Sequence, residues 1–105
     1  GETSELTFDK AVIASGSIPS ALPIEGAELA GVVDSTGALS FDEIPGSLCI
    51  IGGGVIGIEM AHIYSSLGSK VTIVEMLPDI LMNMDSDITA VMRKRIKYPS
   101  LQERR

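Results

Sequence analysis

A glycine-rich hexapeptide limits what this chain can fold into more than any other feature. Residues 52–57 read Gly-Gly-Gly-Val-Ile-Gly and directly follow the apolar run 48–51. A second apolar run, 71–74, is followed by Glu75, which stands 18 residues past Gly57. Since 11 of the 105 residues are glycine, the G-x-G-x-x-G spacing alone could arise by chance. The strand before it, the helix after it and the acidic residue closing the next strand make it specific for a βαβ unit that binds a dinucleotide.

Each position in this motif has its own physical reason. Gly52 permits a tight turn out of the strand, Gly54 leaves room for backbone to approach a pyrophosphate, and Gly57 lets the helix lie close on the sheet. A helix that begins near Gly54 directs free N–H groups and the positive end of its dipole at the phosphates. Glu75 is placed to accept hydrogen bonds from the adenosine ribose, which favours NAD because a 2′-phosphate would be repelled. The alternative is that the glycines are plain turns or caps and that Glu75 is a solvated strand end.

Apolar spacing and turn residues predict the other elements. Residues 6–8 and 10–14 are expected to be extended, the second as a buried strand, and residues 31–33 to form a short strand. Asp34-Ser35-Thr36 can cap a brief turn that runs to Phe41. The helix is predicted over residues 55–67 and ends at Gly68, with the second strand beginning at Lys70. Its apolar stripe is expected to consist of Ile56, Met60, Ile63 and Leu67, with Ala61 and Tyr64 beside them.

A loop from Met76 to Met84 and one more helix are predicted to follow the second strand. Asp85 or Ser86 can cap this helix, which should run to about Lys97. Its apolar side is expected to hold Ile88, Val91, Met92 and Ile96.

The fold class that follows is α/β: a partial Rossmann-type, doubly wound parallel sheet preceded by short β segments. Residues 48–51 are apolar at every position, so we expect helices on both faces of that strand and neighbours on both sides. The chain ends before further strands of such a sheet could form. The incomplete sheet should therefore have an open edge that invites self-pairing into a homo-oligomer.

Charge and rare residue types favour an ordinary globular domain. The net charge is −6, and most of the eight basic residues lie between Arg93 and Arg105. We interpret them as the basic end of a helix and expect no nucleic-acid or membrane partner. The lone cysteine, Cys49, excludes an intrachain disulfide and is expected to be buried in its strand.

The remaining candidates for chemistry are weak. His62 has no carboxylate, cysteine or serine partner at a useful spacing, so we expect no catalytic base there and no catalytic residue in the chain. Met82 and Met84 are expected to pack rather than to bind a metal. With no signal peptide and no apolar run of transmembrane length, a cytoplasmic setting is expected.

Four segments match a known family in both sequence and spacing: residues 10–19, Asp34-Ser35 before Leu39, residues 49–59 and residues 68–75. Together they resemble the flavin-dependent pyridine nucleotide–disulfide oxidoreductases, and within them the dihydrolipoamide dehydrogenase branch. The similarity extends from about residue 6 to residue 97. It implies that residues 1–45 are the end of an FAD-binding domain and a connecting segment. Residues 46–97 would be the first βαβα half of the NAD-binding domain, and residues 98–105 a tail.

The resemblance also implies cofactor contacts. Ser15, Gly16 and Ser17 would contact FAD, with Ser15 keeping the hydroxyl of the usual threonine. Glu59 would lie near the nicotinamide and Glu75 would hold the ribose. The residues implied for NAD are Gly52, Gly53, Gly54, Val55, Ile56, Gly57, Ile58, Glu59 and Glu75.

Several parts of such an enzyme are not in this sequence. The family's pair of cysteines separated by four residues, the first part of its FAD fold and its C-terminal His-Glu pair are missing, so we expect no turnover from this polypeptide alone. The resemblance implies that the parent would pass a hydride between FAD or its disulfide and NAD, as a homodimer that can join a 2-oxo acid dehydrogenase complex. An NADH oxidase, a mercuric reductase, a glutathione reductase or a non-catalytic nucleotide-binding module remain alternatives.

Overall fold

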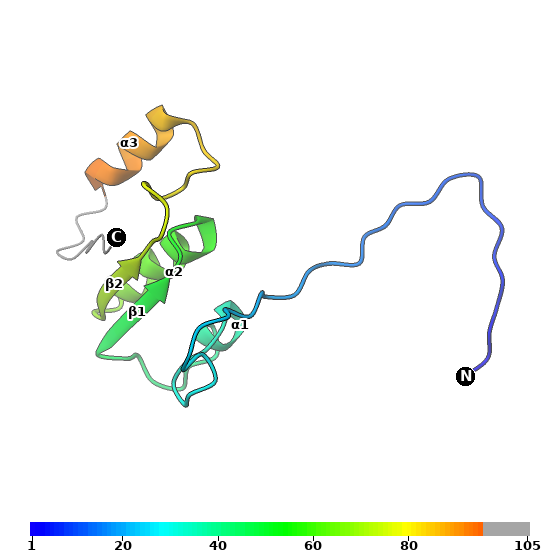
Figure 1. Ribbon diagram of the computed structural model, residues 1–105, viewed down its shortest axis with the longest axis horizontal. Helices are drawn as coiled ribbons and strands as arrows, with labels where there is room; N and C mark the ends of the chain where they lie inside the picture. Colours follow the sequence, from blue (N-terminus) through cyan, green and yellow to red (C-terminus); the bar gives the residue numbers. More distant parts are fainter. Residues whose placement is uncertain (96–105) are drawn as a thin grey trace.

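A strand–helix–strand unit forms the centre of the molecule. The computed structural model describes residues 1–95. Along these residues the elements are α1 (Ser35–Ala38), β1 (Ser47–Ile51), α2 (Val55–Ser66), β2 (Lys70–Val74) and α3 (Ser86–Arg95). In Figure 1 the N-terminal residues form a long arm that leads away from this compact part. The strand, helix and second strand predicted around the glycine motif are confirmed.

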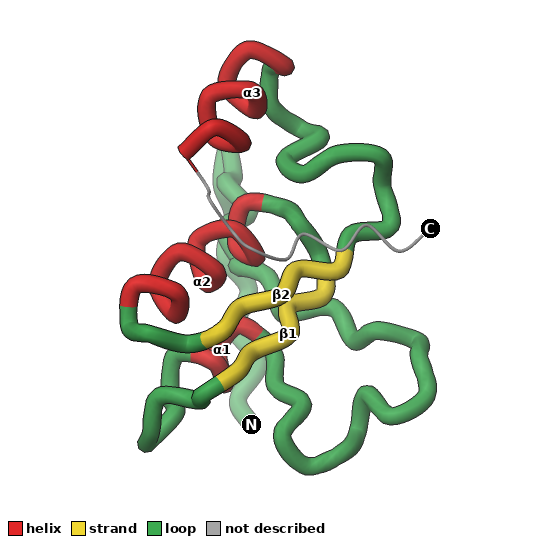
Figure 2. The backbone as a smooth tube through the Cα atoms, turned by 90° about the vertical axis from the view of Figure 1, so that its left-hand side faces the viewer, coloured by secondary structure: helices red, strands yellow, loops and turns green. Residues whose placement is uncertain are grey.

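The two strands form a parallel sheet. Ser47 pairs with Lys70 at one end and Ile51 with Val74 at the other. Because parallel strands need a crossover connection, α2 carries the chain back to the start of β2, and Figure 2 shows it beside the two strands. The α/β fold class is therefore confirmed as a partial parallel sheet with its crossover helix.

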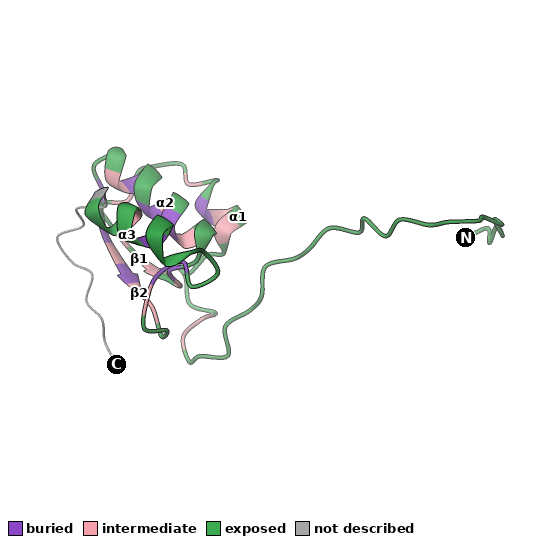
Figure 3. Cartoon of the chain, turned by 90° about the horizontal axis from the view of Figure 1, so that it is seen from above, coloured by how far each residue is buried: buried purple, intermediate pink, exposed green. Residues whose placement is uncertain are grey.

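The core lies between α2 and the sheet. Val71 and Ile73 of β2 are buried against one face of α2, and two residues of the following loop, Ile80 and Leu81, are buried in the same cluster. Figure 3 shows buried segments on α2 and β2. The helix contributes Ile58, Ala61 and Tyr64. The Tyr64 hydroxyl donates to the carbonyl oxygen of Ala38, so the core also holds α1 in place.

The side of α2 that meets the sheet differs from the predicted stripe. Ile56, at 58% exposure, and Leu67, at 51%, lie outside the core, as does the exposed Ile63. The helix is apolar nearly all round, so periodicity could not select one face. The face is selected instead by close contact with the sheet, which the small residues Gly57 and Ala61 allow.

Two strands predicted before the glycine motif are absent from the described part of the chain. Residues 10–14 are not a buried strand, since Val12 and Ile13 are each 91% exposed. Residues 31–33 follow a series of turns and pair with no strand. A strand requires a neighbour to complete its hydrogen bonds. Within residues 1–95 the only strands paired with each other are β1 and β2. The turn capped by Asp34 is confirmed, because the Asp34 carboxylate accepts a hydrogen bond from the Gly37 N–H at 2.8 Å.

The face of the sheet turned away from α2 is open. Along β1, Ser47, Cys49 and Ile51 are exposed, whereas Leu48 and Ile50 are half-buried. The prediction that this strand and Cys49 are buried on both faces is therefore wrong for this chain. The reason is that, within residues 1–95, α2 is the helix that packs on the sheet, and it covers only one face.

The last described element, α3, differs from its prediction in what it buries. Ile88 and Val91 are exposed, Thr89 is buried, and Met92 packs against the core cluster. The predicted contributions of Ile96 and Lys97, and the tail 98–105, lie outside the described residues. Met82 and Met84 pack only in part, since both are exposed. None of the helices found in residues 1–95 is long and apolar enough to cross a membrane.

Candidate functional site

The glycine motif turns the chain from β1 into α2 through two glycines with different roles. Gly52 has φ +107°, a value that side chains disfavour, and its N–H donates to the carbonyl oxygen of Val74 at 2.8 Å. A Cβ atom on Gly57 would lie 2.0 Å from the carbonyl oxygen of Gly52. The tight turn at Gly52 and the close packing at Gly57 are therefore both observed as predicted.

Gly54 opens the motif to its surroundings. It is the N-cap of α2, and a Cβ atom there would meet no atom within 4 Å. Among residues 1–95 the amides of Gly54, Val55, Ile56 and Gly57 have no hydrogen-bond acceptor. The first turn of α2 contains no acidic residue. Unpaired amides at a helix N-terminus attract anions, so this end of α2 fits a diphosphate.

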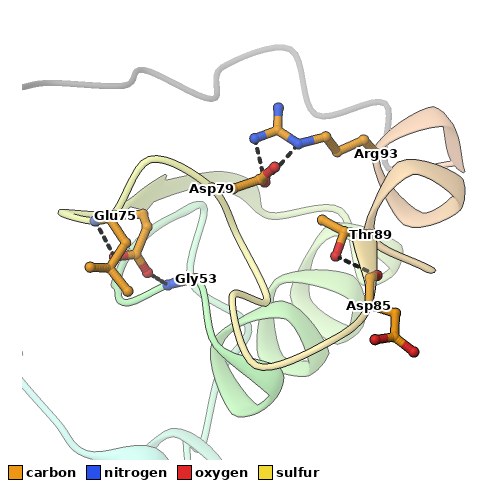
Figure 4. A network of polar contacts seen from close by, with 7 residues as sticks. Gly53, Glu75, Asp79, Asp85, Thr89 and Arg93 are labelled. Carbon is orange, nitrogen blue, oxygen red and sulfur yellow. Dashed lines mark hydrogen bonds and ion pairs between the residues drawn. The ribbon is translucent and has the colours of Figure 1, made fainter. Parts of the chain in front are cut away.

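Glu75 lies next to these amides at the end of β2. Its Oε2 atom accepts a hydrogen bond from the Gly53 N–H at 2.6 Å, and its Oε1 atom accepts one from the Leu77 N–H at 2.7 Å (Figure 4). The Leu77 amide, followed by that of Gly53, holds the pKa of the Glu75 carboxyl below its ordinary value of 4.5. The carboxylate is therefore a fixed negative charge beside the glycine motif.

The two strands bring the candidate residues together at one edge of the sheet. Gly52 follows β1 and Glu75 follows β2, so both stand at the carboxyl ends of parallel strands, where α/β sheets bind their ligands. Glu59 is exposed further along α2, whereas the Ile58 side chain is buried in the core. Ser15, Gly16 and Ser17 are exposed in the N-terminal arm and do not join this group (Figure 1). Nucleotide contacts of all these residues stay predictions.

Sequence reasoning assigned no role to the loop that follows Glu75. The Leu81 N–H donates to the carbonyl oxygen of Gly53 at 2.8 Å, and the side chain of Ile80 is 1% exposed. Asp79 pairs with Arg93 of α3 (Figure 4), the Arg93 Nε atom lying 2.8 Å from Asp79 Oδ1. Two adjacent apolar residues, Ile80 and Leu81, in an otherwise irregular stretch were the sequence signal that this loop is anchored.

Comparison with known proteins extends the likeness to almost the whole chain. A family model described as pyridine nucleotide-disulphide oxidoreductase matches residues 1–99. This chain belongs to the pyridine nucleotide-disulphide oxidoreductase family. The family predicted from the sequence motifs is thus confirmed, and the match includes both the N-terminal arm and the glycine motif.

Curated members of this family include close relatives of the chain. It is 49% identical over 92 residues to the dihydrolipoyl dehydrogenase of Vibrio cholerae, covering 88% of this chain and 19% of that protein. It is 46% identical over 96 residues to dihydrolipoyl dehydrogenase 3 of Haloarcula marismortui, covering 90% of this chain and 20% of that protein. It is 45% identical over 97 residues to the dihydrolipoyl dehydrogenase of Geobacillus stearothermophilus, covering 91% of this chain and 20% of that protein. The chain therefore spans about a fifth of the length of these family members.

Proposed function

We propose that this chain supplies the NAD(H)-binding motif of a flavin-dependent dihydrolipoyl dehydrogenase. The observation that carries the proposal is the open glycine loop, whose unpaired amides from Gly54 to Gly57 stand beside the anionic carboxylate of Glu75. The names of the relatives in Vibrio cholerae and Geobacillus stearothermophilus support the class of enzyme.

The diphosphate and the ribose would be bound by different groups. The amides at the start of α2 would donate to the diphosphate oxygens. The Glu75 carboxylate accepts two backbone hydrogen bonds, from Gly53 and Leu77. A carboxylate has about four lone-pair sites, so it can also accept the two ribose hydroxyls. A 2′-phosphate would place a second negative charge there, which favours NAD over NADP.

The remaining steps of the proposed reaction involve groups outside the described site. When bound, NAD⁺ would serve as the hydride acceptor. Residues 1–45 would belong to the FAD side of the enzyme, with Ser15, Gly16 and Ser17 facing that cofactor, and residues 46–97 to the NAD side. Cys49 is the only cysteine in the sequence. Because oxidation of a dithiol to a disulfide through the protein needs a cysteine pair, we expect the isolated chain to bind NADH without turnover.

Calorimetric titration of the 105-residue chain with NADH and NADPH tests the binding role. Circular dichroism first establishes that the chain is folded under the same conditions. We expect saturable heat with NADH and an affinity for NADPH at least about tenfold lower, a difference of ~1.4 kcal/mol. Gly46→Ala is the matched control, because a Cβ there meets no atom within 4 Å and the residue lies outside the motif. A folded chain that gives no heat with either nucleotide, or equal affinities, would contradict the proposal.

The substrate is tested on the complete gene product that contains this sequence. We expect it to form NADH from NAD⁺ and dihydrolipoamide. Reduction of glutathione disulfide or of mercuric ion instead, with dihydrolipoamide left unchanged, would place the protein in another branch of the family.

A further inference from the structure

Gly53, the middle glycine of the motif, is held from three sides. Its N–H donates to Oε2 of Glu75 at 2.6 Å, and its carbonyl oxygen accepts from the Leu81 N–H at 2.8 Å. A Cβ atom on Gly53 would lie 2.8 Å from Cγ2 of Ile80, so the Ile80 side chain packs directly on the glycine backbone. Gly53 is buried, whereas its neighbour Gly54 is exposed.

Glu75 holds the N–H of Gly53, whereas the contacts to its carbonyl oxygen and to its Cα side come from one short segment, residues 77–81, which we name the brace. The brace is itself fixed, since Ile80 and Leu81 are buried in the core cluster. Asp79 of the brace also pairs with Arg93 of α3, and the Leu77 N–H donates to Glu75. The brace thus joins the core and α3 to the glycine motif.

The Leu81 hydrogen bond determines where the next amide points. In a trans peptide the C=O of one residue and the N–H of the next lie in one plane and point in opposite directions. The chain contains no cis peptide bond within residues 1–95. When the Gly53 carbonyl points at the Leu81 N–H, the Gly54 N–H must therefore point away from the brace. That amide has no acceptor among the described residues.

We propose that the brace aligns the glycine motif before a nucleotide arrives, and that Ile80 and Leu81 are positioning residues for NAD(H) affinity. The identity of the ligand rests on the proposed function, whereas the alignment of the glycine motif is a property of this chain alone. Three consecutive glycines would otherwise sample many conformations. Ordering one backbone residue on binding costs about 5- to 30-fold in affinity. An already aligned loop avoids this loss.

Amide hydrogen exchange of the nucleotide-free chain gives the first test. We expect the Gly53 amide, bonded to Glu75, to exchange only when the domain unfolds, while the amides of Gly54, Val55 and Ile56 exchange freely. This measurement needs no variant. Exchange of Gly53 as fast as that of Gly54 would overturn the inference.

A matched pair of variants, Ile80→Ala and Ile73→Ala, separates positioning from general stability. Both isoleucines are buried in the same cluster, at 1% and 2% exposure, but Ile73 lies on β2 and faces α2. We expect both variants to lose stability and therefore to speed exchange through global unfolding. Only Ile80→Ala should speed Gly53 exchange by about a further tenfold relative to the amides of β2, and only it should weaken NADH binding by about tenfold, as expected for one residue released. Equal effects of the two variants on Gly53 exchange relative to the β2 amides would refute the brace.

A rescue experiment tests the contact itself. Gly53→Ala should weaken NADH binding because its methyl group meets Ile80 Cγ2 at 2.8 Å. In the Ile80→Ala background this atom is gone, so the same substitution should cost at least about threefold less affinity, as expected for residues in contact. Additive losses would count against the contact. If the wild-type chain shows no NADH heat but Gly53 still loses protection relative to the β2 amides only in Ile80→Ala, the brace stands and the proposed function falls.

Discussion

Replacing Gly57 by alanine tests how closely α2 must approach the glycine turn. The added Cβ would lie 2.0 Å from the Gly52 carbonyl oxygen and 3.2 Å from its carbonyl carbon. Non-bonded heavy atoms meet at about 3.5 Å, so the start of the helix would have to retreat by about 1 Å or more. The obstructing atoms are backbone, which cannot rotate away. Such overpacking costs about 1–3 kcal/mol, and alanine returns up to about 1 kcal/mol as a better helix former.

The cost should fall at the upper end of that range, because Ile58 and Ala61 follow Gly57 on the same helix and would be drawn from the core. We expect a net loss of about 2 kcal/mol, which lowers the Tm of a domain of this size by roughly 8–16 °C. Thermal unfolding followed by circular dichroism measures it, with Gly46→Ala as the control. A Gly57→Ala chain that melts within about 2 °C of Gly46→Ala would refute the close packing of α2 on the turn.

Three further predictions concern the ligand-facing residues. Gly54→Ala should leave the Tm almost unchanged, since its Cβ meets no atom within 4 Å. It should raise the calorimetric Kd for NADH about tenfold. Equal affinity of the variant and the wild type would show that no phosphate approaches Gly54. Glu75→Arg should shift the NADH-to-NADPH affinity ratio toward NADPH. The affinity for both nucleotides should fall, because the amides of Gly53 and Leu77 lose their acceptor. An unchanged ratio in paired titrations would show that Glu75 does not select between NADH and NADPH. The lowered pKa of Glu75 means that its stabilising effect is complete above pH 4.5 and is lost as the pH falls through the lower folded-state value. Urea unfolding from about pH 7 to pH 3 should show this loss in the wild type and not in Glu75→Gln, and identical profiles would contradict it.

Local chemistry made the nucleotide unit predictable. Gly52 and Gly57 are required by a backbone angle and a backbone contact, both of which depend on residues close in sequence. Gly68 ends α2 with φ +98°, as the glycine after a helix commonly does. The Asp34 cap likewise bonds to an amide only three residues away. Such features need no knowledge of the rest of the fold.

Features that depend on distant neighbours could not be predicted in the same way. Residues 10–14 have the composition of a buried strand, but Val12 and Ile13 have no strand to pair with among residues 1–95. Cys49 is exposed for a related reason, because no described helix covers that face of the sheet. The contact between Gly53 and Ile80 joins residues 27 positions apart across a loop with no periodic pattern. Periodicity identifies elements but does not say which surfaces meet.

Leu81 has a backbone conformation that leucine disfavours, with φ +54°. The left-handed region costs a side chain about 1–2 kcal/mol, whereas burying a leucine contributes about 1.5–3 kcal/mol. At 5% exposure, Leu81 gains nearly all of the stabilisation that burial provides. This gain roughly cancels the backbone cost, before the hydrogen bond from the Leu81 N–H to Gly53 is counted. Glycine or asparagine would suit the backbone but empty the core, whereas a β-branched apolar residue would fill the core but suit this backbone angle even less than leucine does. Very few amino acids can therefore occupy position 81, and a designer who transplants this glycine motif into another sheet must carry that leucine with it.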